Sequence, residues 1–170
     1  MKSAYDVACA KLAARMRTEK EIRDFLGEKE YEKGEIDEAI TDLKEFGYID
    51  DKRYAVEYFR YAKKKSKAEA MIFRELAAKG IAADFARNAI EDARAEAEAD
   101  AMGEEQDFES DSEIATRLAE KMLAAQIEDG KPVDDKFLAR VARRLASKGF
   151  SANTVYSTLA DIKSKAREML

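Results

Sequence analysis

Three short turns in this sequence are each surrounded by apolar residues at the same spacing. The turns span 29–31, 79–81 and 148–150, and each begins with a lysine. Apolar side chains stand five and nine residues before the last residue of each turn, and five and nine residues after it. These positions are Ile22, Leu26, Ile36, Ile40, Ile72, Leu76, Ala86, Ile90, Val141, Leu145, Val155 and Leu159. A register that occurs three times predicts three copies of one supersecondary unit.

The period of the apolar residues within each copy is helical. Residues Ile36, Ala39, Ile40 and Leu43 follow the i, i+3, i+4, i+7 rule, for example. The chain has one proline and 39% charged residues, a composition that favours solvated helices over strands. The predicted helices span 4–16, 19–28, 33–46, 51–64, 67–78, 82–100, 112–127, 134–147 and 152–167.

The spacing of the turns predicts how the chain divides. The first two turns lie 50 residues apart and the last two 69, and the extra residues include an acidic run. We therefore predict repeats at 1–49, 50–100 and 113–170, with a mobile acidic linker at 101–112. A three-helix unit buries little apolar surface alone, so each repeat is expected to stack on the next. The predicted fold is all-α: three tandem three-helix repeats in an elongated, curved array.

Capping signals agree with these helices. Thr18 with Glu21, and Ser66 with Glu69, have the spacing of capping boxes, and Ser151 can cap the last helix. A glycine follows three of the predicted helices, where a left-handed residue is favoured. These glycines are Gly47, Gly80 and Gly149.

Charge is distributed unevenly along the chain. The net charge is −5, but residues 91–113 contain eleven acids and one base, which leaves +5 on the remainder. Acids at 107, 109 and 111 have the spacing of an EF-hand loop, yet Ser112 and Leu118 occupy its glycine and glutamate positions. A solvated acidic linker is therefore the better interpretation than a calcium site.

Groups for catalysis are scarce. The chain has no histidine and one cysteine, Cys9, and its seven glycines form no phosphate-binding motif. We predict no enzymatic activity and no cofactor or metal. A single cysteine cannot form an internal disulfide, which is typical of a reducing cytoplasm. No apolar run approaches the roughly 20 residues needed to cross a bilayer, so we expect a cytoplasmic protein without membrane contact.

Basic side chains gather on two predicted helices, 51–64 and 134–147, and on the residues that follow each. No acid occurs between residues 136 and 148. The cations lie outside the apolar arc of each helix, as a solvated face would, but they equally suit phosphates or an acidic protein groove. The candidate partner- or DNA-binding residues are Arg53, Arg60, Lys63, Lys64, Lys65, Lys67, Arg140, Arg143, Arg144 and Lys148.

Two residues near these cations allow more than one interpretation. Tyr61 borders the apolar arc of its helix and could stack on a base, although packing at the rim of the core is more ordinary. Arg53 follows Asp50 and Asp51, so a local ion pair at the helix start is expected for it.

Residues 40–58 resemble a segment that occurs in a known protein family. They join a helix end, Gly47, two further residues, the paired acids Asp50 and Asp51, and an Arg-aromatic-Ala helix start. This stretch is similar to the junction between the first two repeats of RecX proteins, and the turns at 79–81 and 148–150 resemble the later Lys-Gly turns of that family. The resemblance covers about residues 4–165. It departs at Glu30, where the family usually has glycine.

The resemblance implies a regulatory protein that binds RecA and its filament on single-stranded DNA. RecX-like proteins restrain the recombinase, ATPase and coprotease activities of RecA, in recombination and the SOS response of the bacterial cytoplasm. The resemblance also implies no cofactor and no catalysis, and we expect a monomer. The residues alone leave two alternatives: a stand-alone DNA-binding module, and a helical adaptor for an unrelated protein.

Overall fold

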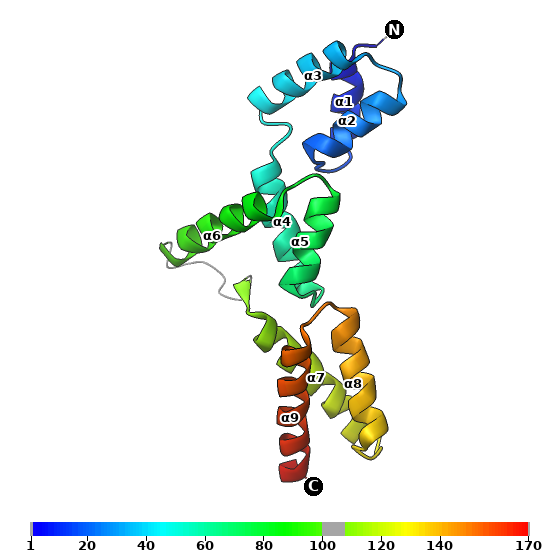
Figure 1. The fold of residues 1–170 in the computed structure, drawn as a ribbon, viewed down its shortest axis with the longest axis vertical. Coiled ribbons are helices and arrows are strands. Elements are labelled where there is room, and N and C mark those ends of the chain that lie inside the picture. Colours follow the sequence, from blue (N-terminus) through cyan, green and yellow to red (C-terminus); the bar gives the residue numbers. More distant parts are fainter. Residues whose placement is uncertain (1, 100–107, 170) are drawn as a thin grey trace. The chain divides into compact units, whose positions relative to one another are not determined.

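The computed structural model describes residues 2–99 and 108–169 (Figure 1). Its described residues form helices and no strands, which confirms the all-α prediction. The helices are α1 (Ala4–Leu12), α2 (Glu19–Glu28), α3 (Lys33–Glu45), α4 (Asp51–Lys64), α5 (Glu69–Ala78), α6 (Ala83–Ala99), α7 (Asp111–Glu128), α8 (Asp135–Ser147) and α9 (Ala152–Met169).

The chain forms two compact units. The first contains residues 1–59 and 73–99, and the second contains residues 60–72 and 100–170, as far as these are described. Helices α4 and α5 therefore contribute to both units. The predicted boundaries of the three repeats come from sequence repetition and stay a prediction, as does the elongated, curved arrangement. Most of the predicted linker at 101–112 lies outside the described residues.

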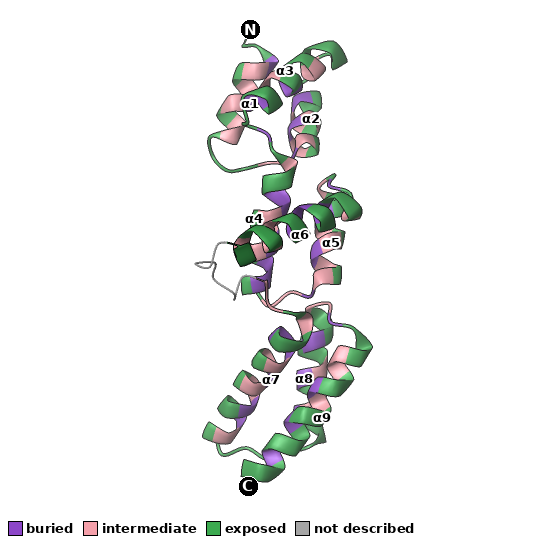
Figure 2. Ribbon diagram, turned by 90° about the vertical axis from the view of Figure 1, so that its left-hand side faces the viewer, coloured by how far each residue is buried: buried purple, intermediate pink, exposed green. Residues whose placement is uncertain are grey.

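The repeated apolar register forms the core of each unit. Nine of its twelve positions are buried, and Ile36, Val155 and Leu159 are partly buried against the core clusters (Figure 2). In the first unit one cluster joins α1, α2 and α3; in the second another joins α7, α8 and α9. Burying one such aliphatic side chain contributes about 1.5–3 kcal/mol, so the shared register accounts for much of the stability.

Two of the three predicted caps are confirmed and one is wrong. Thr18 and Glu21 form the reciprocal capping box of α2, and Ser151 accepts a hydrogen bond from the backbone nitrogen of Thr154 at 3.1 Å. Ser66, however, has a φ of 56° and lies before the helix, which begins at Glu69. A cap residue needs an extended backbone, so Ser66 cannot close the start of α5.

The first helix ends at Leu12 and not at residue 16 as predicted. Residues 13–16 favour helix by composition, but the chain must turn within the few residues that precede α2. The Thr18 hydroxyl also donates a hydrogen bond to the carbonyl oxygen of Lys79. The segment between α1 and α2 must therefore place Thr18 next to the turn at 79–81. A tertiary contact has overridden local helix propensity here.

Candidate functional site

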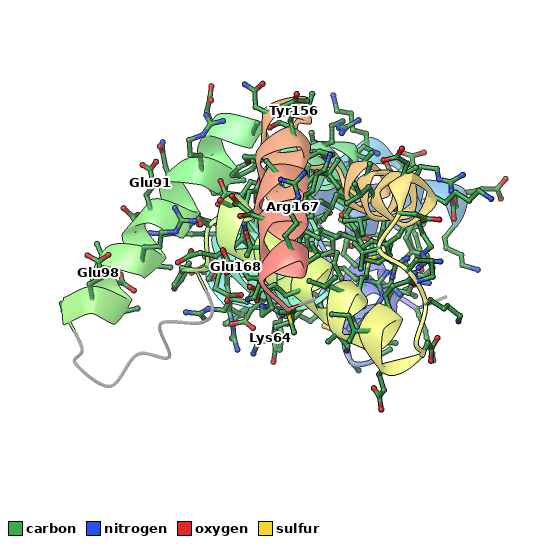
Figure 3. All side chains as sticks on the ribbon, turned by 90° about the horizontal axis from the view of Figure 1, so that it is seen from below. Lys64, Glu91, Glu98, Tyr156, Arg167 and Glu168 are labelled. Carbon is green, nitrogen blue, oxygen red and sulfur yellow. The ribbon has the colours of Figure 1, made fainter. Side chains whose placement is uncertain are left out.

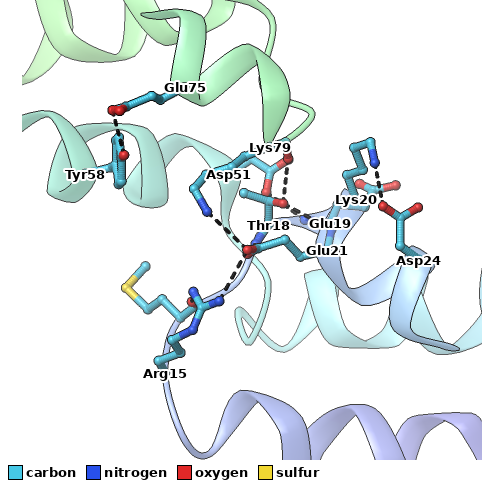
Figure 4. Close-up of polar contacts among 11 residues, drawn as sticks. Arg15, Thr18, Glu19, Lys20, Glu21, Asp24, Asp51, Tyr58, Glu75 and Lys79 are labelled. Carbon is cyan, nitrogen blue, oxygen red and sulfur yellow. Dashed lines mark hydrogen bonds and ion pairs between the residues drawn. The ribbon is translucent and has the colours of Figure 1, made fainter. Parts of the chain in front are cut away.

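The start of α2 is held by two segments that follow it in the chain (Figure 4). Asp51, the first residue of α4, accepts a hydrogen bond from the backbone nitrogen of Glu19 at 2.9 Å. The Thr18 hydroxyl donates to the carbonyl oxygen of Lys79 at 2.7 Å. We call this arrangement the first junction; it comprises residues 18–20, 51 and 79–80.

The start of α5 is held in the same way in the second unit. Asp111, the first residue of α7, accepts hydrogen bonds from the backbone nitrogen of Glu69 at 3.0 and 3.2 Å. The backbone nitrogen of Ala68 donates to the carbonyl oxygen of Lys148 at 3.0 Å. This second junction comprises residues 68–71, 111 and 148–149. Asp111 thus supplies the cap that was predicted for Ser66, because a carboxylate at a helix N-terminus satisfies free amides and the helix dipole.

Both junctions require glycine in the lysine turn. A Cβ on Gly80 would lie 2.4 Å from the Cβ of Lys20, and one on Gly149 would lie 2.8 Å from the Cβ of Met71. Both glycines have a left-handed backbone, with φ of 87° and 89°. Glu30 occupies the matching place in the first turn with φ 63°, but it is exposed. The exposed side chain of Glu30 shows that the first turn leaves room for a residue other than glycine.

The lysines of these two turns have different electrostatic surroundings. The ammonium of Lys79 lies 3.2 Å from a carboxylate oxygen of Glu21. Burial alone would lower the pKa of Lys79, but its bonds to Tyr54 and Glu21 outweigh that effect and raise the pKa. Burial also lowers the pKa of Lys148, and there the neighbouring charges lower it further. Those neighbours are the cations Arg144, Lys67 and Lys65.

The second junction therefore joins the two basic stretches that the sequence keeps far apart. The ammonium of Lys148 donates a hydrogen bond of 2.8 Å to the carbonyl oxygen of Lys65, 83 residues earlier. We call Lys65, Lys67, Arg144 and Lys148 the cationic cluster. It combines two groups of predicted site residues on one surface, which separate helical wheels do not reveal.

Positive charge continues from the cluster along α8. Arg140, Arg143 and Arg144 line a shallow groove together with Lys121 of α7. The guanidinium of Arg140 is oriented by a hydrogen bond to Gln126 and by the Phe137 ring, whose centroid is 5.3 Å away. Sequence reasoning missed Lys121 because it selected helices that carry several cations, and α7 has only Arg117 and Lys121. The sequence signal that could have identified Lys121 is its place on α7 beside the apolar residues that line the groove.

Lys63 is unlike the other predicted binding residues because only 2% of its side chain is exposed. Its ammonium lies 2.8 Å from Asp111 and 3.3 Å from Glu69, so it neutralises the carboxylate that caps α5. A buried ammonium cannot meet a large polyanion. Lys63 therefore holds the second junction and does not belong to the exposed basic surface.

The remaining predicted residues lie outside the cluster, and their binding role stays a prediction. Lys64 is exposed on the last turn of α4, and the guanidinium of Arg60 lies 5.4 Å from the ring centroid of Phe108. Arg53 is exposed in the first unit. Asp50 accepts a hydrogen bond from its backbone nitrogen at 2.9 Å, and within the described residues no ion pair of the Arg53 side chain occurs.

Residues 2–99 and 108–169 contain neither a membrane-spanning helix nor a cluster of metal ligands. No helix there has both the length and the apolar character to span a membrane. No three potential metal ligands come together among the same residues. Asp107, the first acid of the EF-hand-like spacing, lies outside the described residues.

Sequence comparisons connect this architecture to known proteins. Residues 4–43, which contain α1, α2 and most of α3, match a family model described as the first three-helix domain of RecX. The chain is 29% identical over 164 residues to regulatory protein RecX of Bacillus subtilis (strain 168), covering 96% of this chain and 56% of the relative. It is 43% identical over 82 residues to regulatory protein RecX of Bacillus velezensis, covering 48% of this chain and 31% of the relative. The chain thus spans about half the length of the curated relatives it matches, or less.

Solved structures agree on the fold. The crystal structure of RecX from Lactobacillus salivarius superposes with a TM-score of 0.68 at 24% identity, covering 94% of both chains. A crystal structure of regulatory protein RecX gives a TM-score of 0.64 at 26% identity, covering 93% of this chain and 70% of the other. The likeness extends over nearly all of the helices described above.

Proposed function

Because this chain belongs to the RecX family, we propose that it is a regulatory protein that binds RecA and the RecA filament on single-stranded DNA. In this proposal it restrains the recombinase, ATPase and coprotease activities of RecA, in DNA recombination and repair and the SOS response. It acts in the cytoplasm by binding, without catalysis and without a cofactor.

The observation that carries the proposal is the contrast between Lys79 and Lys148. The two lysines occupy the same place in two junctions, yet Lys79 is paired with Glu21 and Lys148 lies among cations. A group of neighbouring cations attracts a partner of opposite charge, so this surface suits a polyanion. The phosphates of the filament DNA are suitable, since each contact releases condensed counterions.

The groove along α8 extends this surface beyond what one small anion would need. Arg144 belongs to both the cationic cluster and the groove, so the positive surface is continuous from Lys148 to Arg140. A linear array of cations suits a polymer with evenly spaced charges. This supports the phosphate backbone over a single phosphate group as the ligand.

The test is the ATPase activity of RecA on single-stranded DNA, with the full chain added. We expect inhibition at micromolar protein. The triple variant Lys65→Gln, Arg144→Gln, Lys148→Gln should need at least about tenfold more protein, with a salt slope lower by about 2–3. A control variant removes three exposed cations of the same unit: Lys131→Gln, Lys163→Gln, Arg167→Gln.

Three results bear on the proposal. Full inhibition by the control and weak inhibition by the cluster variant would support it. Equal loss in both variants would mean that only total charge matters. No inhibition by the natural chain at micromolar excess would contradict the regulatory role on RecA.

Direct DNA binding without RecA is a second candidate function, and the cationic cluster itself favours it. A mobility shift with naked DNA across a salt series tests this candidate. Binding with a steep salt dependence would support a stand-alone module. Absence of binding at low salt would reject it and leave the filament, or an unrelated partner protein, as the target.

A further inference from the structure

We infer that Tyr61, at the edge of the cationic cluster, is a stacking platform for an unpaired base, so that this surface selects single-stranded over duplex nucleic acid. The inference rests on the proposed function, because the same cations hold the phosphates. It adds to that function one binding residue, Tyr61, and a preference for single-stranded over duplex nucleic acid.

Tyr61 is placed where a base can reach it. It lies on the last turn of α4, and 55% of the residue is exposed. Tyr54 of the same helix is buried in the core, whereas more than half of Tyr61 remains accessible. Tyr61 therefore does not pack within the core.

The ring also adjoins the cations. The Lys65 ammonium lies 5.7 Å from the ring centroid of Tyr61, and the carbonyl oxygen of Lys65 accepts the hydrogen bond from Lys148. Lysine has a flexible four-carbon stem, so an entering base can displace the Lys65 ammonium from the ring towards the adjoining phosphate. One residue thus links the aromatic surface to the cationic cluster.

An aromatic ring beside cations distinguishes strands by the accessibility of their bases. In a single strand the face of a base is available, and each base that stacks on an aromatic side chain adds to the affinity regardless of its identity. In a duplex both faces are covered by neighbouring base pairs, so the ring gains nothing without unstacking them. The cations serve both forms, whereas Tyr61 serves only the single strand.

An acidic protein surface would use this site differently. It would pair with Lys65, Lys67, Arg144 and Lys148, but it offers no flat π face to an exposed ring. The combination of ring and cations therefore favours a single-stranded polynucleotide, and an acidic peptide becomes one arm of the test.

The experiment measures binding of the full chain, without RecA, by fluorescence anisotropy at low salt. The probes are a labelled oligothymidylate, a duplex of equal length and a labelled polyglutamate. Tyr61→Ala should weaken oligothymidylate binding about tenfold, or about 1.4 kcal/mol, and change duplex binding less than about twofold. Tyr61→Phe keeps the ring and should bind as the natural chain does.

Tyr156→Ala is the matched control, since Tyr156 is 80% exposed on α9 of the same unit. Tyr156 and Lys64 project from opposite edges of the view in Figure 3, which places Tyr156 away from the end of α4. Circular dichroism confirms that each variant is folded.

The outcomes separate this inference from the proposed function. No loss with Tyr61→Ala, equal loss on single strand and duplex, or preferred binding of polyglutamate would each overturn the stacking role. If the triple cluster variant still lost affinity in those cases, phosphate binding by the cluster would stand. If the natural chain bound neither nucleic acid, both the stacking role and direct binding of phosphates by the cluster would fail.

Discussion

The two junctions share a backbone plan and differ in how their charges are paired. In the first, Lys44 lies 2.8 Å from Glu19 and its hydrogen bond is the main cause of the lowered pKa of that carboxyl. In the second, the buried ammonium of Lys63 lies between Asp111 and Glu69, and three further cations surround Lys148. The comparison shows that capping carboxylates and close glycine contacts are common to both junctions. The surroundings of the turn lysines differ between the two junctions, so this part of the structure can be adapted to binding.

The largest predicted effect tests the close glycine contacts that the two junctions share. Gly80→Ala and Gly149→Ala should each lower the free energy of unfolding by about 3 kcal/mol, because a left-handed alanine is strained and its Cβ overlaps a neighbouring helix. Urea denaturation followed by circular dichroism measures this.

Two other turn positions serve as controls for the glycine variants. Gly130 has φ 66° but no atom within 4 Å of its missing Cβ, so Gly130→Ala should cost only about 1 kcal/mol. Glu30→Gly should be neutral or stabilise slightly, because it relieves a left-handed backbone. If Gly80→Ala cost no more than Gly130→Ala, close approach would not be what both junctions require.

The next effect tests the ion pair that differs between the junctions. Lys63→Met leaves the Asp111 carboxylate without its ammonium, and because Asp111 is 30% exposed we expect a loss of about 2 kcal/mol and not the larger cost of a fully buried charge. Lys44→Met removes an exposed ammonium from Glu19 and should cost less than about 1 kcal/mol.

Chemical denaturation of both variants checks this difference, and Asp111→Asn completes a double-mutant cycle with Lys63→Met. A coupling energy near zero, or an equal cost at Lys44, would show that Lys63 does not hold the second junction.

The smallest effect concerns the turn lysines and is best seen by NMR titration of their side chains. We expect the pKa of Lys79 above its ordinary value and that of Lys148 below it. Lys79 then stabilises the fold fully below its unfolded pKa, and this stabilisation is lost as the pH rises through its folded pKa. Protonated Lys148 weakens the fold, and stability increases as the pH rises through its depressed pKa. Solvent screening keeps both contributions under about 1 kcal/mol.

An added oligothymidylate should raise the pKa of Lys148 and leave that of Lys79 unchanged, because phosphates favour the protonated form only where they bind. Shifts of both lysines in the same direction on folding would remove the electrostatic contrast between the junctions.

Many residues of the candidate site could be predicted from the sequence. Their contacts in space could not, for physical reasons that particular residues show. The basic stretches that contain Lys65 and Arg144 were found because several cations close together in the chain are visible in the sequence. That they meet was not predictable, because the contact joins residues 83 apart. Lys63 was assigned to the binding surface since its helical position lies outside the apolar arc, yet Asp111 draws it into a buried pair.

The sequence by itself determined the helices, their apolar register and the glycine turns, because these depend on contacts a few residues apart along the chain. Tertiary structure alone decided which residue caps α5, why Glu30 can replace a glycine, and which cations share a surface. Each of these depends on the side chains that another segment brings near, and residue spacing carries no information about that distance.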